Sequence, residues 1–173
     1  RSGEASQDSE PNLAVNPTDP TQMAGSAFTP DPNAGVNAPI YVSVDGGATW
    51  TLNSIVPGSG SFGTGDITLR FGGTSNVLYA GILRGDVALR LNTLRTTNFT
   101  QPNVMTVLVQ RDNVDQPYLQ ATTVMGGPGT GLDRVFLAAP ASTRSWMRAS
   151  QNEPASDASA SAKIMAKVSR TSG

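Results

Sequence analysis

The feature that most constrains the fold is an alternating apolar run that ends in an Asp-Gly pair. Residues 40–44 read Ile-Tyr-Val-Ser-Val, the period-two pattern of a half-buried β-strand. Asp45-Gly46 follows directly, and this pair is among the strongest hairpin signals, because glycine takes the positive φ that a tight turn needs. We expect the Asp45 carboxylate to accept hydrogen bonds from turn amides. Trp50, just past the turn, is placed to pack its indole on the hairpin.

Three further short strands predict one antiparallel sheet within the first 60 residues. Each is an apolar segment bounded by the residues that form turns, Pro, Gly, Asn and Asp. We expect the polar residues before the first strand to be a frayed lead-in. In chain order the four expected strands are residues 10–16, 23–28, 40–44 and 51–56.

The same pattern then restarts twice. Leu13, Leu69 and Leu119 occupy the same place in the first strand of three successive units, about 50 residues apart, near the length of propeller repeats. Three restarts predict three similar multi-stranded units. The strands expected in the second and third units are residues 65–71, 77–83, 87–91, 106–109, 116–121, 135–139 and 162–169.

The segment 162–169 has two interpretations. Its Ala and Lys residues are good helix formers, which favours a helix over 160–170. Its place in the third unit favours a third strand, and this is our prediction. The preceding residues 140–160 are rich in Ala, Ser and Pro, and we expect them to form a long loop.

The string that follows the third strand resembles a known motif. Ser43-x-Asp45-x-Gly47-x-Thr49-Trp50 is similar to the Asp box of the BNR-repeat, sialidase-like β-propeller family, and all five defining residues are present. In that family the box holds a blade together far from the active face. The resemblance therefore implies a β-propeller architecture and a structural role for this turn.

The resemblance implies that the units are consecutive blades. The expected fold is an all-β propeller segment of two full four-stranded blades and most of a third. Closed propellers have roughly four to eight blades, so we expect an incomplete ring, completed by a second polypeptide, by further copies or by missing residues. The alternative is a small β-sandwich closed on itself. The expected divisions are a lead-in 1–9, blade 1 at 10–60 with the Asp box 43–50, blade 2 at 61–111, and an incomplete blade 3 at 112–173 with the long loop 140–160.

Two absent residue types restrict the chemistry. The sequence contains no His and no Cys, which removes the commonest general base, the thiol nucleophile, disulfides and the usual zinc ligands. A serine-hydrolase triad is excluded because no histidine can activate the serine. The net charge of −1 gives no reason to expect a nucleic acid or an anionic membrane as partner.

The chain shows no targeting or membrane pattern. It contains no apolar run near the about 18 residues of a transmembrane helix, so we expect no membrane span. It starts at Arg1 and shows no signal-peptide pattern, so we expect either a removed leader or a piece of a longer product. The family resemblance implies a secreted, periplasmic or extracellular location.

Candidate site residues follow from the up-and-down course of strands in a propeller. The start of each first strand and each loop from second to third strand share one end, which is the active face in the resembled family. Glu10 and Asp66 lie at strand starts and form the candidate acid pair of a glycosidase, one donating a proton and the other acting as nucleophile or base. The alternative is that both acids bond to backbone amides. The other candidates on this face are Gln116, Arg84, Asp86, Arg144, Trp146 and Arg148.

The basic and aromatic candidates each have a second interpretation. Arg84 would bind a carboxylate or sulfate bidentately, but Arg84-Gly-Asp86 also fits a turn with a local ion pair. Trp146 stands between Arg144 and Arg148, which suits a sugar-stacking platform or an anchor for the loop.

We expect no cofactor and no metal. The alternative is calcium at Asp112-Asn-Val-Asp115, which offers oxygen ligands but lacks the spacing of an EF-hand loop. The glycine-rich segment 126–131 lacks the Lys-Ser/Thr of a phosphate-binding loop, so we expect a turn there.

Two functions stay open. The first is part of a secreted sialidase-like propeller that serves as a binding or assembly module for glycans. The second is a glycoside hydrolase of that superfamily, with carboxylate acid/base catalysis on the axial face. The segment before the Asp box lacks the Phe-Arg-Ile-Pro of true sialidases, and Arg1 is its only arginine, which favours binding.

Overall fold

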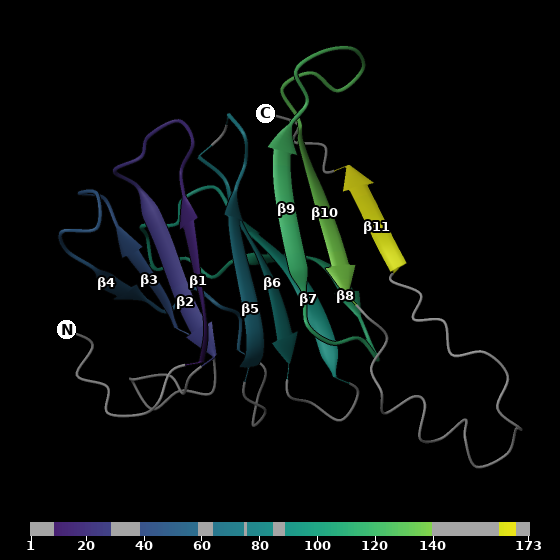
Figure 1. Ribbon diagram of the computed structural model, residues 1–173, viewed down its shortest axis with the longest axis horizontal. Coiled ribbons are helices and arrows are strands. Elements are labelled where there is room, and N and C mark those ends of the chain that lie inside the picture. Colours follow the sequence, from purple (N-terminus) through teal and green to yellow (C-terminus); the bar gives the residue numbers. More distant parts are fainter. Residues whose placement is uncertain are drawn as a thin grey trace, which may run out of the picture.

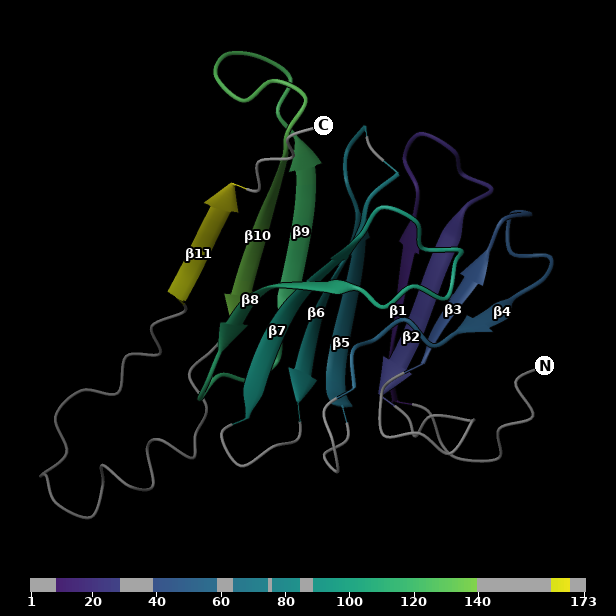
Figure 2. The ribbon, with the colours of Figure 1, turned by 180° about the vertical axis from the view of Figure 1, so that it is seen from behind.

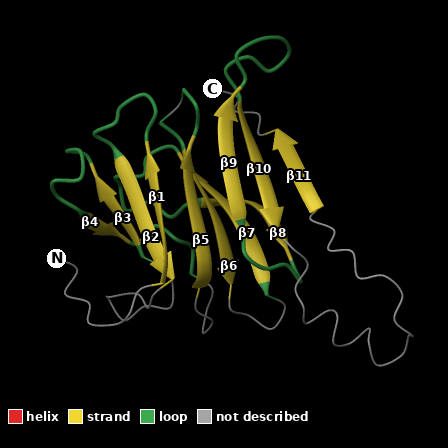
Figure 3. Ribbon diagram, in the orientation of Figure 1, coloured by secondary structure: helices red, strands yellow, loops and turns green. Residues whose placement is uncertain are grey.

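The computed structural model describes residues 9–28, 39–58, 64–74, 76–84, 89–139 and 163–168. In these ranges the chain forms β-strands, turns and loops and no helix (Figure 3). The expected all-β class is confirmed. The strands form three antiparallel sheets of four, four and three strands. Within the same ranges no helix is long and apolar enough to cross a bilayer.

Sheet 1 holds the four strands expected before residue 60, in the order β1-β2-β3-β4. Its last strand is shorter than the predicted 51–56. After Asn53 the chain leaves the sheet, and the buried Ile55 and Val56 enter the core beside sheet 2, where Ile55 O accepts a hydrogen bond of 2.8 Å from Met105 N. The bounds are β1 (Ser9–Val15), β2 (Met23–Phe28), β3 (Ile40–Ser43) and β4 (Thr51–Asn53).

Sheet 2 has the order β5-β6-β7-β8. Its third strand was expected over 87–91, which is wrong, because β7 begins at Arg90 and continues to Thr96. The pattern hides this strand because buried Asn92, Thr93 and Thr96 interrupt its apolar residues. The bounds are β5 (Thr64–Phe71), β6 (Leu78–Arg84), β7 (Arg90–Thr96) and β8 (Thr106–Arg111).

Sheet 3 has the order β11-β10-β9. The segment predicted over 162–169 is a strand and not a helix, and it pairs antiparallel with β10 along its whole length. The expected loop 140–160 lies outside the described residues. The bounds are β9 (Tyr118–Thr123), β10 (Asp133–Ala139) and β11 (Lys163–Val168).

The three sheets stand side by side in one row, and the described residues form no closed ring (Figures 1 and 2). The first strands of the three sheets are neighbours, because β1 contacts β5 and β5 contacts β9. One apolar core lies between sheets 1 and 2 and includes Ala14, Leu69 and Phe71. A second lies between sheets 2 and 3 and includes Tyr79 and Leu119. Each sheet therefore buries a face against the next.

Candidate functional site

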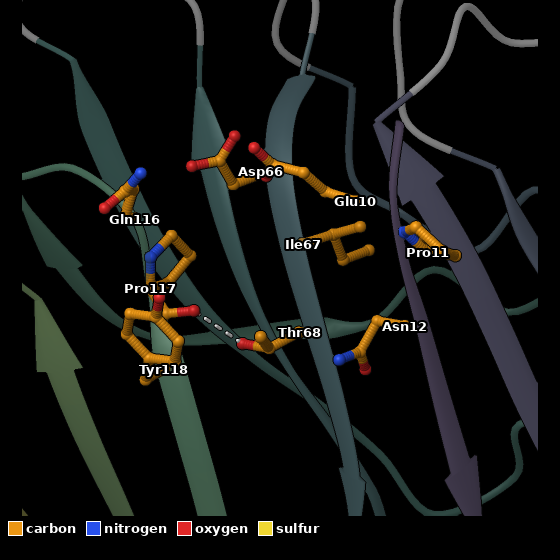
Figure 4. A pocket seen from close by; sticks show the side chains of 9 residues that line it. All are labelled: Glu10, Pro11, Asn12, Asp66, Ile67, Thr68, Gln116, Pro117 and Tyr118. Carbon is orange, nitrogen blue, oxygen red and sulfur yellow. Dashed lines mark hydrogen bonds between the residues drawn. The ribbon is translucent and has the colours of Figure 1, made fainter. Parts of the chain in front are cut away.

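A pocket of about 320 Å³ lies where β1, β5 and β9 begin (Figure 4). Nine residues line it, and they are three tripeptides taken from the same place in the three first strands. Each tripeptide ends just before the recurring leucine at 13, 69 or 119. The tripeptides are Glu10-Pro11-Asn12, Asp66-Ile67-Thr68 and Gln116-Pro117-Tyr118.

The backbone is irregular at each of these strand starts. The pairing of β1 with β2 shifts between Ser9 and Asn12, and that of β5 with β6 shifts between Thr64 and Ile67. Such a bulge leaves a residue outside the ladder and turns its side chain in a new direction. Glu10 and Gln116 also have positive φ, 51° and 41°. For residues other than glycine this conformation costs about 1–3 kcal/mol, and such strained residues tend to cluster at active sites and ligand-binding sites.

A proline follows each of the two strained residues. Pro11 and Pro117 have no N–H and cannot donate a hydrogen bond to a neighbouring strand. At the irregular start of a strand, where the regular ladder has not yet begun, this loses no hydrogen bond. Their rings also fix φ near −65°, which sets the direction in which each first strand leaves the pocket.

The structure brings the predicted acid pair together. Figure 4 shows the carboxyl groups of Glu10 and Asp66 turned toward each other across the pocket mouth. Burial, the negative charge of Glu10 and hydrogen bonding with Glu10 raise the pKa of Asp66 to about 6, and the charge of Asp115 adds to the shift. Asp66 is therefore largely protonated and uncharged below about pH 6, and it carries a negative charge above it.

Side chains from the tripeptides join neighbouring sheets. Asn12 Oδ1 accepts a hydrogen bond of 2.8 Å from Leu69 N, which lies on the open edge of sheet 2. At the matching position Thr68 Oγ1 donates to Pro117 O of sheet 3 at 3.1 Å. The third matching residue, Tyr118, is 65% exposed. The last residue of a tripeptide thus contacts the next unit in two cases, with Asn12 as the acceptor and Thr68 as the donor.

No family model matches this chain, and neither a curated protein nor a solved structure is significantly similar to it.

Arg84, which was also predicted to bind a ligand, does not line this pocket. Arg84 ends β6, where it is buried, and its Nε donates to Asn92 Oδ1 at 3.0 Å. It is a core residue and not part of an exposed loop, because β6 is longer at its end than expected. The remaining four candidates, Asp86, Arg144, Trp146 and Arg148, lie outside the described residues.

The segment considered for calcium uses its carboxylates in other contacts. Asp112 forms an ion pair with Arg90 at 3.1 Å, and Asp115 Oδ1 accepts a hydrogen bond from Gln116 N at 2.9 Å. Across the described ranges no group of three or more acidic side chains could hold a metal ion. The glycine-rich segment 126–131 forms turns, as expected.

The Ser43–Trp50 turn, which resembles an Asp box, lies at the opposite end of sheet 1 from the pocket. Gly46 N donates to Thr21 O at 2.9 Å, which ties the turn to the connection between β1 and β2. β3 and β4 are paired only to Val42 and Thr51. The connection is therefore a wider loop than the two-residue turn that Asp-Gly predicts, although Gly46 and Gly47 do take positive φ.

Asp45 is the hydrogen-bond centre of this loop. Its Oδ1 accepts from Thr49 N at 2.9 Å and from Ser43 Oγ at 2.8 Å, and its Oδ2 accepts from Thr49 Oγ1. These bonds, those from Thr49 first, lower the pKa of Asp45 to about 2. Trp50 Nε1 donates to Gly47 O at 3.0 Å, and its ring lies over Gly25 and Gly47. The predicted hydrogen bonding and indole packing are confirmed.

Sequence reasoning found the first residue of each tripeptide and missed the other two. A signal was present, because Asn12, Thr68 and Tyr118 stand at the same offset before the recurring leucine. Aligning the three units residue by residue would have placed these side chains at the same end as the acids.

Proposed function

We propose that this chain is part of a secreted, propeller-like binding module whose pocket at the strand starts takes a glycan. The observation that carries the proposal is that, among the described residues, three equivalent tripeptides line the pocket. A binding site at the converging ends of repeated sheets is where propeller architectures place ligands, next to the axis. The three sheets are, in this proposal, successive blades.

The chemistry of the lining suits a polyhydroxylated ligand. The carboxyl groups of Glu10 and Asp66 accept hydrogen bonds from hydroxyls, and the Gln116 amide both donates and accepts. The exposed ring of Tyr118 offers an apolar face on which a sugar ring can stack. Few placed polar groups beside an aromatic surface are typical of small-molecule sites.

Two structural observations support the propeller part of the proposal. The first strands are neighbours, and the side chains of Asn12 and Thr68 make contacts in the same direction, each to the following sheet. The Ser43–Trp50 loop, which resembles an Asp box, lies at the end away from the pocket, as the resemblance implies.

Glycan binding is tested on an array, followed by calorimetric titration of the best binder. Replacing Tyr118 or Gln116 with Ala should weaken binding about tenfold or more, because each removes a direct ligand contact. Met125→Ala and Gln101→Ala remove similar exposed side chains away from the pocket and should leave the affinity unchanged. An array without binders, or equal affinities for all four variants, would contradict the proposal.

Glycoside hydrolysis is the second candidate, favoured by the raised pKa of Asp66, which keeps a carboxylic acid protonated at mildly acidic pH. The placement of the Glu10 and Asp66 carboxyl groups, which face each other closely enough for Glu10 to raise the pKa of Asp66, counts against it, because glycosidase carboxyl groups stand about 5 Å or more apart with substrate or water between them (Figure 4). A panel of aryl glycosides assayed from pH 4 to 8 tests it. Turnover that is lost in both Glu10→Gln and Asp66→Asn would establish hydrolysis, and no turnover in the parent protein would exclude it.

A further inference from the structure

The described lining of the pocket contains two acids and no basic side chain. Glu10 and Asp66 turn their carboxyl groups toward each other at the mouth, and the other lining residues are uncharged (Figure 4). Arg70, two positions beyond the part of β5 that lines the pocket, bonds to the backbone instead, because its Nη1 donates to Leu69 O at 2.6 Å. A ligand in this pocket therefore meets negative charge from the described side chains.

The elements around the start of β5 do not neutralise Asp66. Glu10 of β1 and Asp115, just ahead of β9, both raise the pKa of Asp66 by their charge. β2 carries no charged side chain. Arg84, at the end of β6, is buried and its Nε donates to Asn92 Oδ1 at 3.0 Å. Two facing carboxyl groups are thus held beside a third acid, which leaves a cation as the group that would compensate them.

A protonated amine suits these two carboxyl groups better than a hydroxyl does. An ammonium group has three donors and no acceptor, and ionised carboxylates are acceptors only. Hydrogen bonds between a charged donor and a carboxylate are about twice as strong as those between neutral groups. A sugar hydroxyl would make similar contacts but would leave the repulsion between the carboxylates in place, and a sugar carboxylate would add to it.

We propose that the pocket selects an amino sugar whose free ammonium group is bound by the carboxyl groups of Glu10 and Asp66, and that it disfavours acidic sugars. The sugar ring stacks on Tyr118, which is 65% exposed, and the Gln116 amide binds ring hydroxyls. The volume of about 320 Å³ is at the small end of ligand pockets, which suits the end of a glycan. This inference rests on the proposed function and adds the class of its ligand.

Binding of the ammonium group is coupled to the proton on Asp66. The pKa of Asp66 is about 6, so most copies of the protein hold this proton at about pH 5.5. A cation beside the carboxyl group favours its ionised form and lowers its pKa. Binding of an amino sugar should therefore release more than about half a proton to the buffer, whereas a neutral sugar should release none.

Calorimetric titration with three β-1,4-linked tetramers tests the selectivity. The tetramers of glucosamine, N-acetylglucosamine and glucose share their linkage and differ in the group at C2. At about pH 5.5 and low salt, the glucosamine tetramer should bind about tenfold or more tighter than the other two. Raising the salt to about 0.3 M should remove most of this difference, because it screens charges. Sialyllactose should bind more weakly than lactose.

Amide variants identify the groups that bind the ammonium. Asp66→Asn and Glu10→Gln should each reduce the preference for glucosamine over glucose to about twofold or less and keep the affinity for the glucose tetramer. Asp66→Asn should also abolish the proton release, measured by titration in two buffers of different ionisation enthalpy. Asp112→Asn removes the same charge from a side chain outside the lining and should keep both the preference and the release.

Equal affinities for the glucosamine and glucose tetramers in the parent protein, or a preference that survives in both amide variants, would overturn the inference. The salt dependence and the proton release are measured on the parent protein, so the test does not depend on a variant that folds. Array glycans that bind without any preference for amino sugars would leave the proposed function standing. Tight binding of the glucosamine tetramer that Tyr118→Ala and Gln116→Ala do not weaken would support ammonium binding and count against a glycan pocket.

Discussion

Tyr79 of sheet 2 donates a hydrogen bond of 2.9 Å to Oδ2 of Asp133 in sheet 3, and both side chains are buried. Thr123 Oγ1 donates to the other carboxylate oxygen at 2.6 Å. Burial, then the bond to Asp133, raises the pKa of Tyr79 well above its ordinary value, so the phenol stays a donor. This contact fastens the second and third sheets together.

Removing that phenol should destabilise the protein. Tyr79→Phe takes one donor from a buried carboxylate, so we expect the free energy of unfolding to fall by about 1.5–3 kcal/mol in urea titrations. Tyr118→Phe removes a hydroxyl from an exposed ring and should change it by less than about 0.5 kcal/mol. Equal losses in the two variants would show that the Tyr79–Asp133 bond adds nothing to stability.

Gly73 should tolerate no side chain. A Cβ there would stand 2.8 Å from Thr123 N, where backbone and not a flexible side chain blocks it. Gly73→Ala should therefore push sheets 2 and 3 apart and lower the free energy of unfolding by about 1–3 kcal/mol. Gly126 has open space around its Cβ position, so Gly126→Ala is the matched control and should unfold at the parent urea concentration. A Gly73→Ala protein of parental stability would refute this close approach.

Asp66 should make the protein less stable as pH rises. Its pKa is about 6 in the folded chain and 3.8 without the fold, so the native state binds the extra proton between these values. The free energy of unfolding should therefore fall from pH 4 to 6 and level off above. Asp66→Asn should remove this slope and stabilise the protein at pH 7.5 by about 1 kcal/mol or less, since solvent screens the pair. Urea titrations at each pH give the curve, and a variant curve parallel to that of the parent would contradict the assignment.

Asp45 should act in the opposite direction. Its pKa of about 2 lies below the ordinary 3.8, so its stabilising effect is complete above pH 4 and is lost as pH falls toward 2. Asp45→Asn should lower the urea midpoint at pH 7 and flatten the decline on the acid side. Asp112→Asn, which breaks an exposed ion pair, should keep the parental acid profile. If both variants keep it, the Asp45 hydrogen bonds do not contribute to acid stability.

The regular parts of the fold could be predicted because their sequences are regular. In β2 the buried Ala24 and Ser26 alternate with half-buried residues, and the bounds Met23–Phe28 agree with the prediction. The predicted bounds of β7 were wrong because polar Asn92 and Thr93 are buried in the core. Their burial depends on packing between sheets, which a local sequence pattern does not contain. The wide Ser43–Trp50 loop was missed for a related reason, since the bonds to Asp45 hold open a turn that Asp-Gly alone would close.

The sequence predicted the acidic residues of the pocket but not how their carboxyl groups are placed. The acids at positions 10 and 66 were found because they begin first strands, a property of chain order. That their carboxyl groups meet depends on the bulges and on the positive φ of Glu10, neither of which a propensity argument indicates. Arg84 was assigned to a loop because its Gly-Asp neighbours are turn formers, yet the pairing of β6 with β7 carries it into the interior.

The bond between Ile55 and Met105 has a consequence for how such a chain can be divided. Residues between the first two sheets would ordinarily be the natural place to cut or to exchange modules. Here the connector is anchored in a core that both sheets share. A fragment ending after Val56 would expose Ile55 and Val56 to water, and sheet 2 would lose two of the side chains that fill its core with Phe71 and Phe99. The first two sheets therefore behave as one unit when the chain is divided.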